Sequence, residues 1–188
     1  MSTYLTHGVI LNKDNHKDYD AKFVIYTLGH GKISAILRGA KKITSKLNSH
    51  LEFFSVVKIM VAKGASFNRL AGAQLEVKYK NINSSTSKTI IALYFLEVVN
   101  LLIKYDFEDD VVFEIITRFL SLLDDGKSKQ DDLLCLNKNI FELLDHLGYK
   151  PEIKSNKQKG LIAEFNKIVT EIADRQVKSY VMLSKLFD

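Results

Sequence analysis

The side chains able to catalyse a reaction or bind a metal are few and scattered in this sequence. Histidine serves as a general base or a metal ligand only beside suitably placed partners. The five histidines follow no HExxH or paired-ligand spacing: His7, His16, His30, His50 and His146. We therefore expect neither a catalytic histidine nor a histidine-based metal site.

Three pairs of adjacent aspartates are the other candidates for acid–base chemistry, at residues 109–110, 124–125 and 131–132. Such chemistry needs two carboxyl groups held in different environments. The pairs lie at expected helix ends, where negative charge near an N-terminus is favourable without any catalytic role. We interpret them as structural.

The single cysteine, Cys135, lies between two leucines without an evident basic neighbour, which is typical of a buried structural thiol. One cysteine excludes an intramolecular disulfide and a cysteine-cluster zinc site. Gly29 and Gly31 begin no complete GxGxxG motif, and no P-loop is present. Nothing in the sequence specifies an enzyme.

Basic residues concentrated in the first part of the chain are the strongest indication of function. Of the 188 residues, the first 80 carry 13 Lys and Arg against 5 Asp and Glu, whereas residues 81–148 carry 6 against 12. Residues 149–188 carry 8 against 5. The uneven distribution indicates two modules, with a polyanion as partner of the first.

The densest basic group comprises Arg38, Lys41, Lys42 and Lys46, and Lys32 lies just before it. Lysine and arginine on flexible loops at the rim of a barrel follow a phosphate backbone well. A solvated surface is the alternative interpretation. Strand aromatics offer stacking surfaces, although most such rings belong to a core: Tyr4, Tyr26, Phe53, Phe54 and Phe67.

These residues must be positioned by strands. Alternating patterns of β-branched and aromatic residues predict five strands. They cover residues 3–11, 22–28, 32–37, 53–62 and 67–79. Turns are expected at residues 29–31 and 64–66, and Gly72 is expected at a bulge. Five short, turn-connected strands predict a small closed barrel or a sandwich.

A polar break at residues 81–87 predicts a boundary between a domain of residues 1–80 and one of residues 81–188. Beyond it the apolar period changes to that of helices, with Gly148 as the residue that ends one of them. Helices are expected at residues 88–105, 111–123 and 133–147, with one or two over 161–186. The fold class is therefore α+β, a barrel followed by an all-helical domain.

The apolar stretches are too short to cross a membrane. The longest run, residues 90–96, takes in Glu97 and Asn100 when extended, and it stays below the ~20 residues that a span needs. The N-terminus lacks a basic segment before an apolar block. We expect a cytoplasmic protein that does not bind membranes.

Short segments over most of the chain resemble the RecO family of bacterial recombination mediators. They include YLTHGVIL from Tyr4, RGAKK from Arg38, LEFF from Leu51 and FELLDHLGYKP from Phe141. The resemblance implies an N-terminal OB-fold and a helical C-terminal domain. It also implies binding of single- and double-stranded DNA near the nucleoid, annealing of complementary strands, work with RecR, and RecA loading on DNA coated with single-strand-binding protein.

The resemblance assigns DNA contacts to Arg38, Lys41 and Lys42, and to Lys46 in the same loop. Arg175 and Lys178 match a closing basic segment. Three residues apart on a helix, they share one face, which is either a second DNA contact or an ordinary polar surface.

One departure from the family concerns zinc. Many members carry four zinc-binding cysteines after the Gly-Tyr-x-Pro segment, whereas here Pro151 runs into a short basic linker without cysteine. We expect no zinc and no other cofactor. Two other functions remain open: a helical interaction scaffold with incidental charge, and an OB module that binds RNA.

Overall fold

The computed structural model describes residues 2–41 and 47–187. The chain forms two compact units, of which the first comprises Met1–Lys78 and Ile103–Phe113. The second comprises Tyr79–Leu102 and Glu114–Asp188. Residues 103–113, here called the return segment, thus group with the first unit, although the sequence analysis placed them in a domain of residues 81–188.

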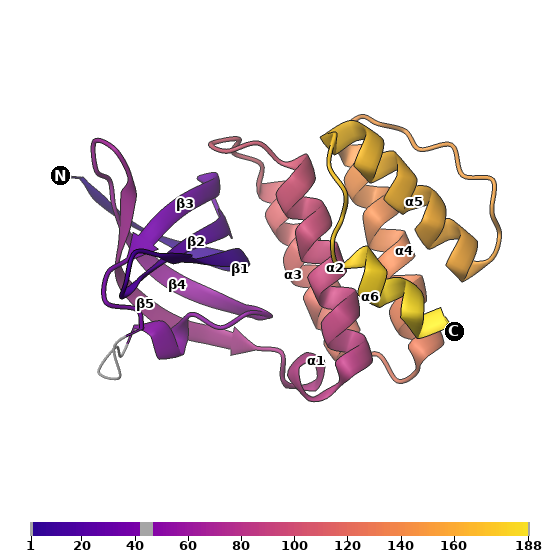
Figure 1. Cartoon of the computed structure of the whole chain (residues 1–188), viewed down its shortest axis with the longest axis horizontal. Helices are drawn as coiled ribbons and strands as arrows, with labels where there is room; N and C mark the ends of the chain where they lie inside the picture. The colour runs from indigo at the N-terminus through magenta and orange to yellow at the C-terminus, as the bar shows by residue number, and fades with distance from the viewer. Residues whose placement is uncertain (1, 42–46, 188) are drawn as a thin grey trace. The chain divides into compact units, whose positions relative to one another are not determined.

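Five strands of the first unit close into a barrel (Figure 1), in the order β1-β2-β3-β5-β4. They are β1 (Thr3–His16), β2 (Asp20–Thr27), β3 (Gly31–Leu37), β4 (Ser55–Ala62) and β5 (Asn68–Lys78). Neighbours are antiparallel except β3 and β5, which pair in parallel. A closed five-stranded barrel of this kind is an OB-fold, so the predicted barrel is confirmed.

Alternate side chains of these strands fill the interior of the barrel, as the period of two requires. The core includes Ile10, Phe23, Ile25, Ile33, Ala35, Leu37, Val57, Ile59, Val61 and Leu70. The predicted bulge is also present. Met60 pairs with Gly72 and Val61 pairs with Leu70, so that Ala71 is left without a partner in β4.

The first strand is longer than expected. β1 continues past residue 11 to His16, with a register irregularity between Ile10 and Asn12. Its polar end pairs with residues 20–24 of β2. Main-chain pairing, and not an apolar pattern, therefore holds this part of the strand.

Helices make up the second unit, together with the short 3-10 turn Lys185–Phe187. They are α1 (Lys80–Ser84), α2 (Thr86–Leu102), α3 (Asp110–Asp125), α4 (Lys129–His146), α5 (Gln158–Ala173) and α6 (Tyr180–Ser184). Another 3-10 turn, Asn48–His50, belongs to the barrel unit. α2 is apolar nearly all round and buries residues on several faces, which fits the central position predicted for it. Its Phe95 stacks on Phe119 of α3 with ring centroids 3.9 Å apart.

One helix lies where the sequence analysis expected none. α1 forms inside the expected polar break, because Ile82 is fully buried and its N–H donates to the Asp124 carboxylate over 2.9 Å. Of the one or two helices expected over residues 161–186, the structure has two, α5 and α6, with Asp174 in the left-handed region (φ 49°) after α5. Gly148 ends α4 as predicted, with φ 85°. Among the described residues, no helix has the length and apolarity of a bilayer-spanning segment.

Candidate nucleic-acid interface

A groove of ≈ 700 Å³ lies on the outside of the barrel, over β2 and β3. Its lining comes from the end of β1, the β1–β2 turn, both strands, the β4–β5 loop and the return segment. The charged and aromatic lining residues are His16, Lys17, Lys22, Phe67, Tyr105 and Asp106. This is the face of an OB-fold, flanked by the loops after β1 and before β5, that binds oligonucleotides in other proteins.

Strand alternation explains how the two strands contribute to the groove. Phe23 and Ala35 face the barrel core, so their neighbours Lys22 and Ile36 face outward, and these two residues are cross-strand partners. Ser34 follows on the same face and also lines the groove. The floor of the groove therefore consists of the polar Ser34 and the apolar Ile36, with the cation of Lys22 beside them.

One of the predicted basic residues, Lys41, contacts the β1–β2 turn that lines one end of this groove. Lys41 donates its N–H to the Tyr19 carbonyl over 3.0 Å, and its Nζ lies 3.4 Å from the carbonyl oxygen of Lys17. Arg38 follows β3 directly, and both Arg38 and Lys41 are exposed. We call Lys17, Arg38 and Lys41 the basic end of the barrel. It brings together charges that the sequence separates by more than twenty residues.

Gly39 makes the basic end possible. It has φ 65°, in the region that favours glycine, and its N–H donates to the Asp20 carboxylate over 2.9 Å. The chain after β3 is thereby fixed against the start of β2. The predicted DNA contacts Lys42 and Lys46 lie outside the described residues.

Lys32, which the sequence analysis grouped with the basic residues predicted to contact DNA, is buried. Its residue is 5% exposed, and its Nζ lies 4.5 Å from the centroid of the Tyr105 ring. Burial lowers the pKa of this lysine. A strand pattern marks Lys32 as outward facing but cannot show that Tyr105 covers it. The structure therefore does not support Lys32 as an exposed phosphate contact.

Arg175 and Lys178 are exposed, but they do not share a helix face. Both lie between α5 and α6, outside either helix, so this premise of the sequence analysis is wrong. The N–H of Lys178 instead donates to the Glu97 carboxylate over 2.9 Å. A DNA contact at these two residues stays a prediction.

Of the aromatic residues considered for stacking, Phe67 is the one that lines the groove. Tyr26 and Phe54 are buried, and Tyr4 and Phe53 are half-buried. Sequence reasoning missed Lys17 and Lys22 because they lie outside the dense basic group. It also missed Tyr105, for which the only signal was a tyrosine at the end of an expected helix.

The aspartate pairs are structural, as expected from their places at helix ends. Asp109 accepts from the N–H of Val111 over 3.0 Å at the start of α3. Ser128 caps α4 by accepting from the N–H of Asp131 over 3.1 Å. Asp124 binds the N-terminal turn of α1.

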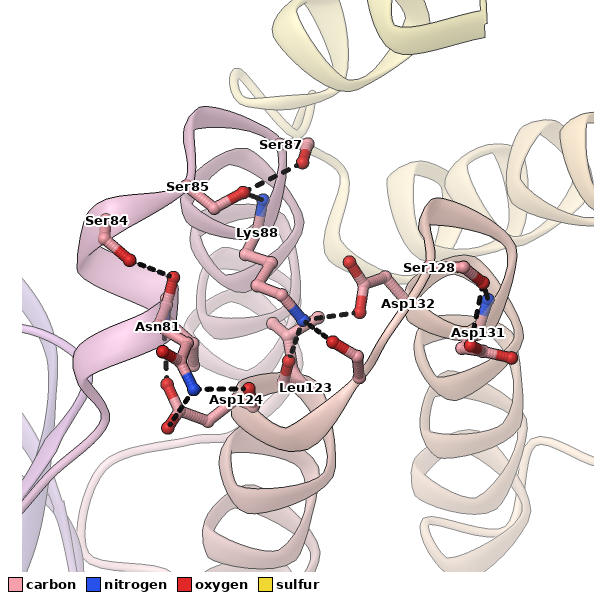
Figure 2. A network of polar contacts seen from close by, with 12 residues as sticks. Asn81, Ser84, Ser85, Ser87, Lys88, Leu123, Asp124, Ser128, Asp131 and Asp132 are labelled. Carbon is pink, nitrogen blue, oxygen red and sulfur yellow. Dashed lines mark hydrogen bonds and ion pairs between the residues drawn. The ribbon is translucent and has the colours of Figure 1, made fainter.

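Asp132, of the third pair, forms a buried ion pair with Lys88 (Figure 2). The Lys88 Nζ lies 2.8 Å from Asp132 Oδ1, with side chains 11% and 4% exposed. The ammonium also donates to the carbonyls of Leu123 and Gly126. Its three donors are thus used to join the start of α2, the end of α3 and the start of α4, which indicates a structural role.

Cys135 is half-buried, and burial raises the pKa of its thiol to about 11, with Asp132 adding to the effect. Such a thiol is a poor nucleophile at neutral pH. Within residues 2–41 and 47–187, no three His, Cys, Asp or Glu side chains form a group that would hold a metal ion. The absence of zinc stays a prediction.

The barrel topology and its groove define an OB-fold protein with a helical second unit. Residues 1–79 match the family described as "Recombination protein O N terminal". The proteins named "DNA repair protein RecO" from Dehalococcoides mccartyi and Roseiflexus are each 27% identical, over 165 and 151 residues. These alignments cover 87% and 80% of this chain. The first 79 residues match the N-terminal domain of RecO, and the chain as a whole is similar to RecO proteins.

The matched relatives are longer than this chain. It spans 64% of the Dehalococcoides protein and 52% of the Roseiflexus protein. A third relative, from Desulfatibacillum aliphaticivorans, is 28% identical over 150 residues, which is 78% of this chain and 56% of that protein.

Proposed function

We propose that this chain is a non-enzymatic DNA-binding protein of recombination and repair, which anneals complementary strands. The observation that supports this function most directly is the groove on the OB face, bordered by the basic end of the barrel. The name of the relatives, DNA repair protein RecO, agrees with it.

The mechanism is electrostatic. Cations at Lys17, Lys22, Arg38 and Lys41 neutralise phosphates of a bound strand and release counterions. Neutralised strands repel each other less, so complementary sequences meet more often. If ~4–6 phosphates are neutralised, the slope of log affinity against log salt on single strands is about −3 to −4.

The proposed function also involves protein partners. RecR and single-strand-binding protein are the expected protein partners, with RecA loading on coated DNA as the outcome and the bacterial cytoplasm, near the nucleoid, as the place. Residues 81–102 and 114–148 of the helical unit carry 5 Lys and Arg against 8 Asp and Glu, a charge balance opposite in sign to that of the strands. No cofactor enters this mechanism.

A binding titration of the full chain tests the DNA site. The Lys17→Glu/Arg38→Glu variant should bind a fluorescein-labelled oligothymidine about tenfold more weakly at low salt, with a salt slope shallower by about 0.7 per lost phosphate contact. The matched control, Lys127→Glu/Lys138→Glu, makes the same change of charge at exposed residues of the helical unit. Equal losses in both variants would mean that only net charge matters, against a DNA site on the barrel.

Annealing tests the activity itself. Two complementary labelled oligonucleotides, bare or coated with single-strand-binding protein, should anneal rapidly with the intact chain and slowly with the Arg38→Glu/Lys41→Glu variant. No acceleration by the intact chain would overturn the annealing function and leave the scaffold hypothesis. Tighter binding of an RNA of the same sequence would favour an RNA-binding module.

A further inference from the structure

Two exposed aromatic rings line the groove from parts of the chain far apart in sequence. Phe67 belongs to the β4–β5 loop and is 41% exposed, and Tyr105 belongs to the return segment and is 49% exposed. Exposed rings beside cations in a groove are the features that stack nucleobases in proteins that bind single strands.

Each ring is held by a cation from a neighbouring strand. The Arg69 guanidinium lies 5.4 Å from the centroid of Phe67, and the Lys32 ammonium lies 4.5 Å from that of Tyr105. The backbone beside Tyr105 is fixed as well, because the Asp106 N–H donates to the Lys32 carbonyl over 3.0 Å. Both rings are therefore positioned before a ligand arrives, which lowers the entropy lost on binding.

We propose that Phe67 and Tyr105 form a base-stacking site that gives the groove a preference for unpaired nucleotides over duplex DNA. This inference rests on the proposed DNA-binding function and adds the form of DNA that the groove selects. Phosphates are available to the cations in both forms. The faces of duplex bases are covered by their neighbours, so only an unstacked base can lie on either ring.

The experiment compares three ligands on the full chain: a labelled oligothymidine, a duplex of equal length, and an abasic oligonucleotide with the same phosphates and no bases. Phe67→Leu and Tyr105→Leu keep apolar bulk but remove the ring. Each should weaken oligothymidine binding about fivefold or more, while duplex and abasic affinities and the salt slope stay within twofold. Phe107→Leu is the matched control, because Phe107 is 51% exposed in the same segment but does not line the groove.

The outcomes separate this inference from the function on which it rests. If the intact chain binds neither form of DNA, the proposed function fails. If it binds DNA and the ring variants bind oligothymidine as tightly as the intact chain, stacking is overturned while DNA binding stands. Equal losses on oligothymidine and abasic strands would show that the rings only hold the groove in shape, which also overturns the inference.

A fluorescence readout is independent of affinity, because the chain contains no tryptophan. Phe67→Trp and Tyr105→Trp each introduce a single indole in place of a ring. Both variants should retain oligothymidine affinity, and stacked bases should quench their emission. The abasic strand should bind without that quenching. Equal quenching by both strands would contradict stacking.

Discussion

At the scale of single residues, charge has two separate uses in this protein. Lys17, Arg38 and Lys41 keep their charges at the surface, where they attract an anion. Lys88 has its charge almost fully buried, and its ammonium is surrounded by Asp132 and two carbonyl oxygens (Figure 2). We assign the proposed binding to the first arrangement, and the second holds three helices together.

Breaking the buried pair should destabilise the fold. Lys88→Met leaves the Asp132 carboxylate buried without its partner, and we expect the free energy of unfolding to fall by about 3–5 kcal/mol. Urea denaturation followed by circular dichroism measures the loss. The control is Lys167→Met, whose exposed pair with Glu171 spans 3.9 Å and should contribute no more than about 0.5 kcal/mol. Equal losses in the two variants would contradict a structural role for Lys88.

The thiol of Cys135 should react slowly and in a pH-dependent way. Burial, aided by Asp132, raises its pKa to about 11, so at pH 8 the reactive thiolate is roughly a hundredfold scarcer than for an exposed thiol. Alkylation by iodoacetamide, followed by mass spectrometry, should be at least that much slower than for glutathione and should speed up as the pH rises toward 11. Labelling as fast as that of glutathione would show that the thiol is neither buried nor raised in pKa.

The sequence correctly indicated which cations are exposed at the end of β3, but it could not show that another cation, Lys32, is covered. Arg38 and Lys41 are exposed at the end of β3, where the sequence places a loop. Lys32 has the same outward register but is covered by Tyr105, which lies 73 positions further along the chain. A pattern in one strand carries no information about a segment that folds over it.

At the scale of elements, the contact between the return segment and the β2–β3 turn shapes one side of the groove. Gly29 and Gly31 both have positive φ, of 74° and 60°. A Cβ on Gly31 would lie 1.9 Å from the Phe107 carbonyl oxygen, whereas a Cβ on Gly29 would meet nothing within 4 Å. A side chain would be strained at either position, and only at Gly31 would it also clash with the return segment.

This difference predicts unequal effects of the same substitution. Gly29→Ala should lower the free energy of unfolding by about 1–2 kcal/mol through backbone strain alone. Gly31→Ala should lower it clearly further and should speed hydrogen exchange at the Asp106 N–H, which is bonded to the Lys32 carbonyl. Urea denaturation and exchange mass spectrometry measure both effects. If the two variants behaved alike, the return segment would not be packed against the turn.

Elements with a clear apolar period were predictable, and those held by main-chain or polar contacts were not. The predicted strands and the long helices are present, because the spacing of their apolar residues matches the side that each element buries. The polar end of β1 is held by pairing with β2, and α1 by the Asp124 carboxylate and buried Ile82. Both depend on partners distant in sequence.

At the scale of the whole molecule, each of the two units has an apolar core of its own. The barrel has its own buried cluster, and the helical unit packs Phe95, Phe119 and Phe165 in its interior. We therefore expect EDTA to leave the Tm unchanged and elemental analysis to find well under one zinc per chain. A fall in Tm of several degrees on chelation would show that a metal stabilises this chain.

The return segment also has a consequence for the order of events on the ribosome. The strands are complete once Lys78 has been synthesised, but the barrel unit ends at Phe113, 35 residues later. At ~5–20 residues per second, translation needs roughly 2–7 s for that stretch. A nascent chain therefore has all five strands before it has Tyr105, and α2 must be made before the second ring of the groove exists.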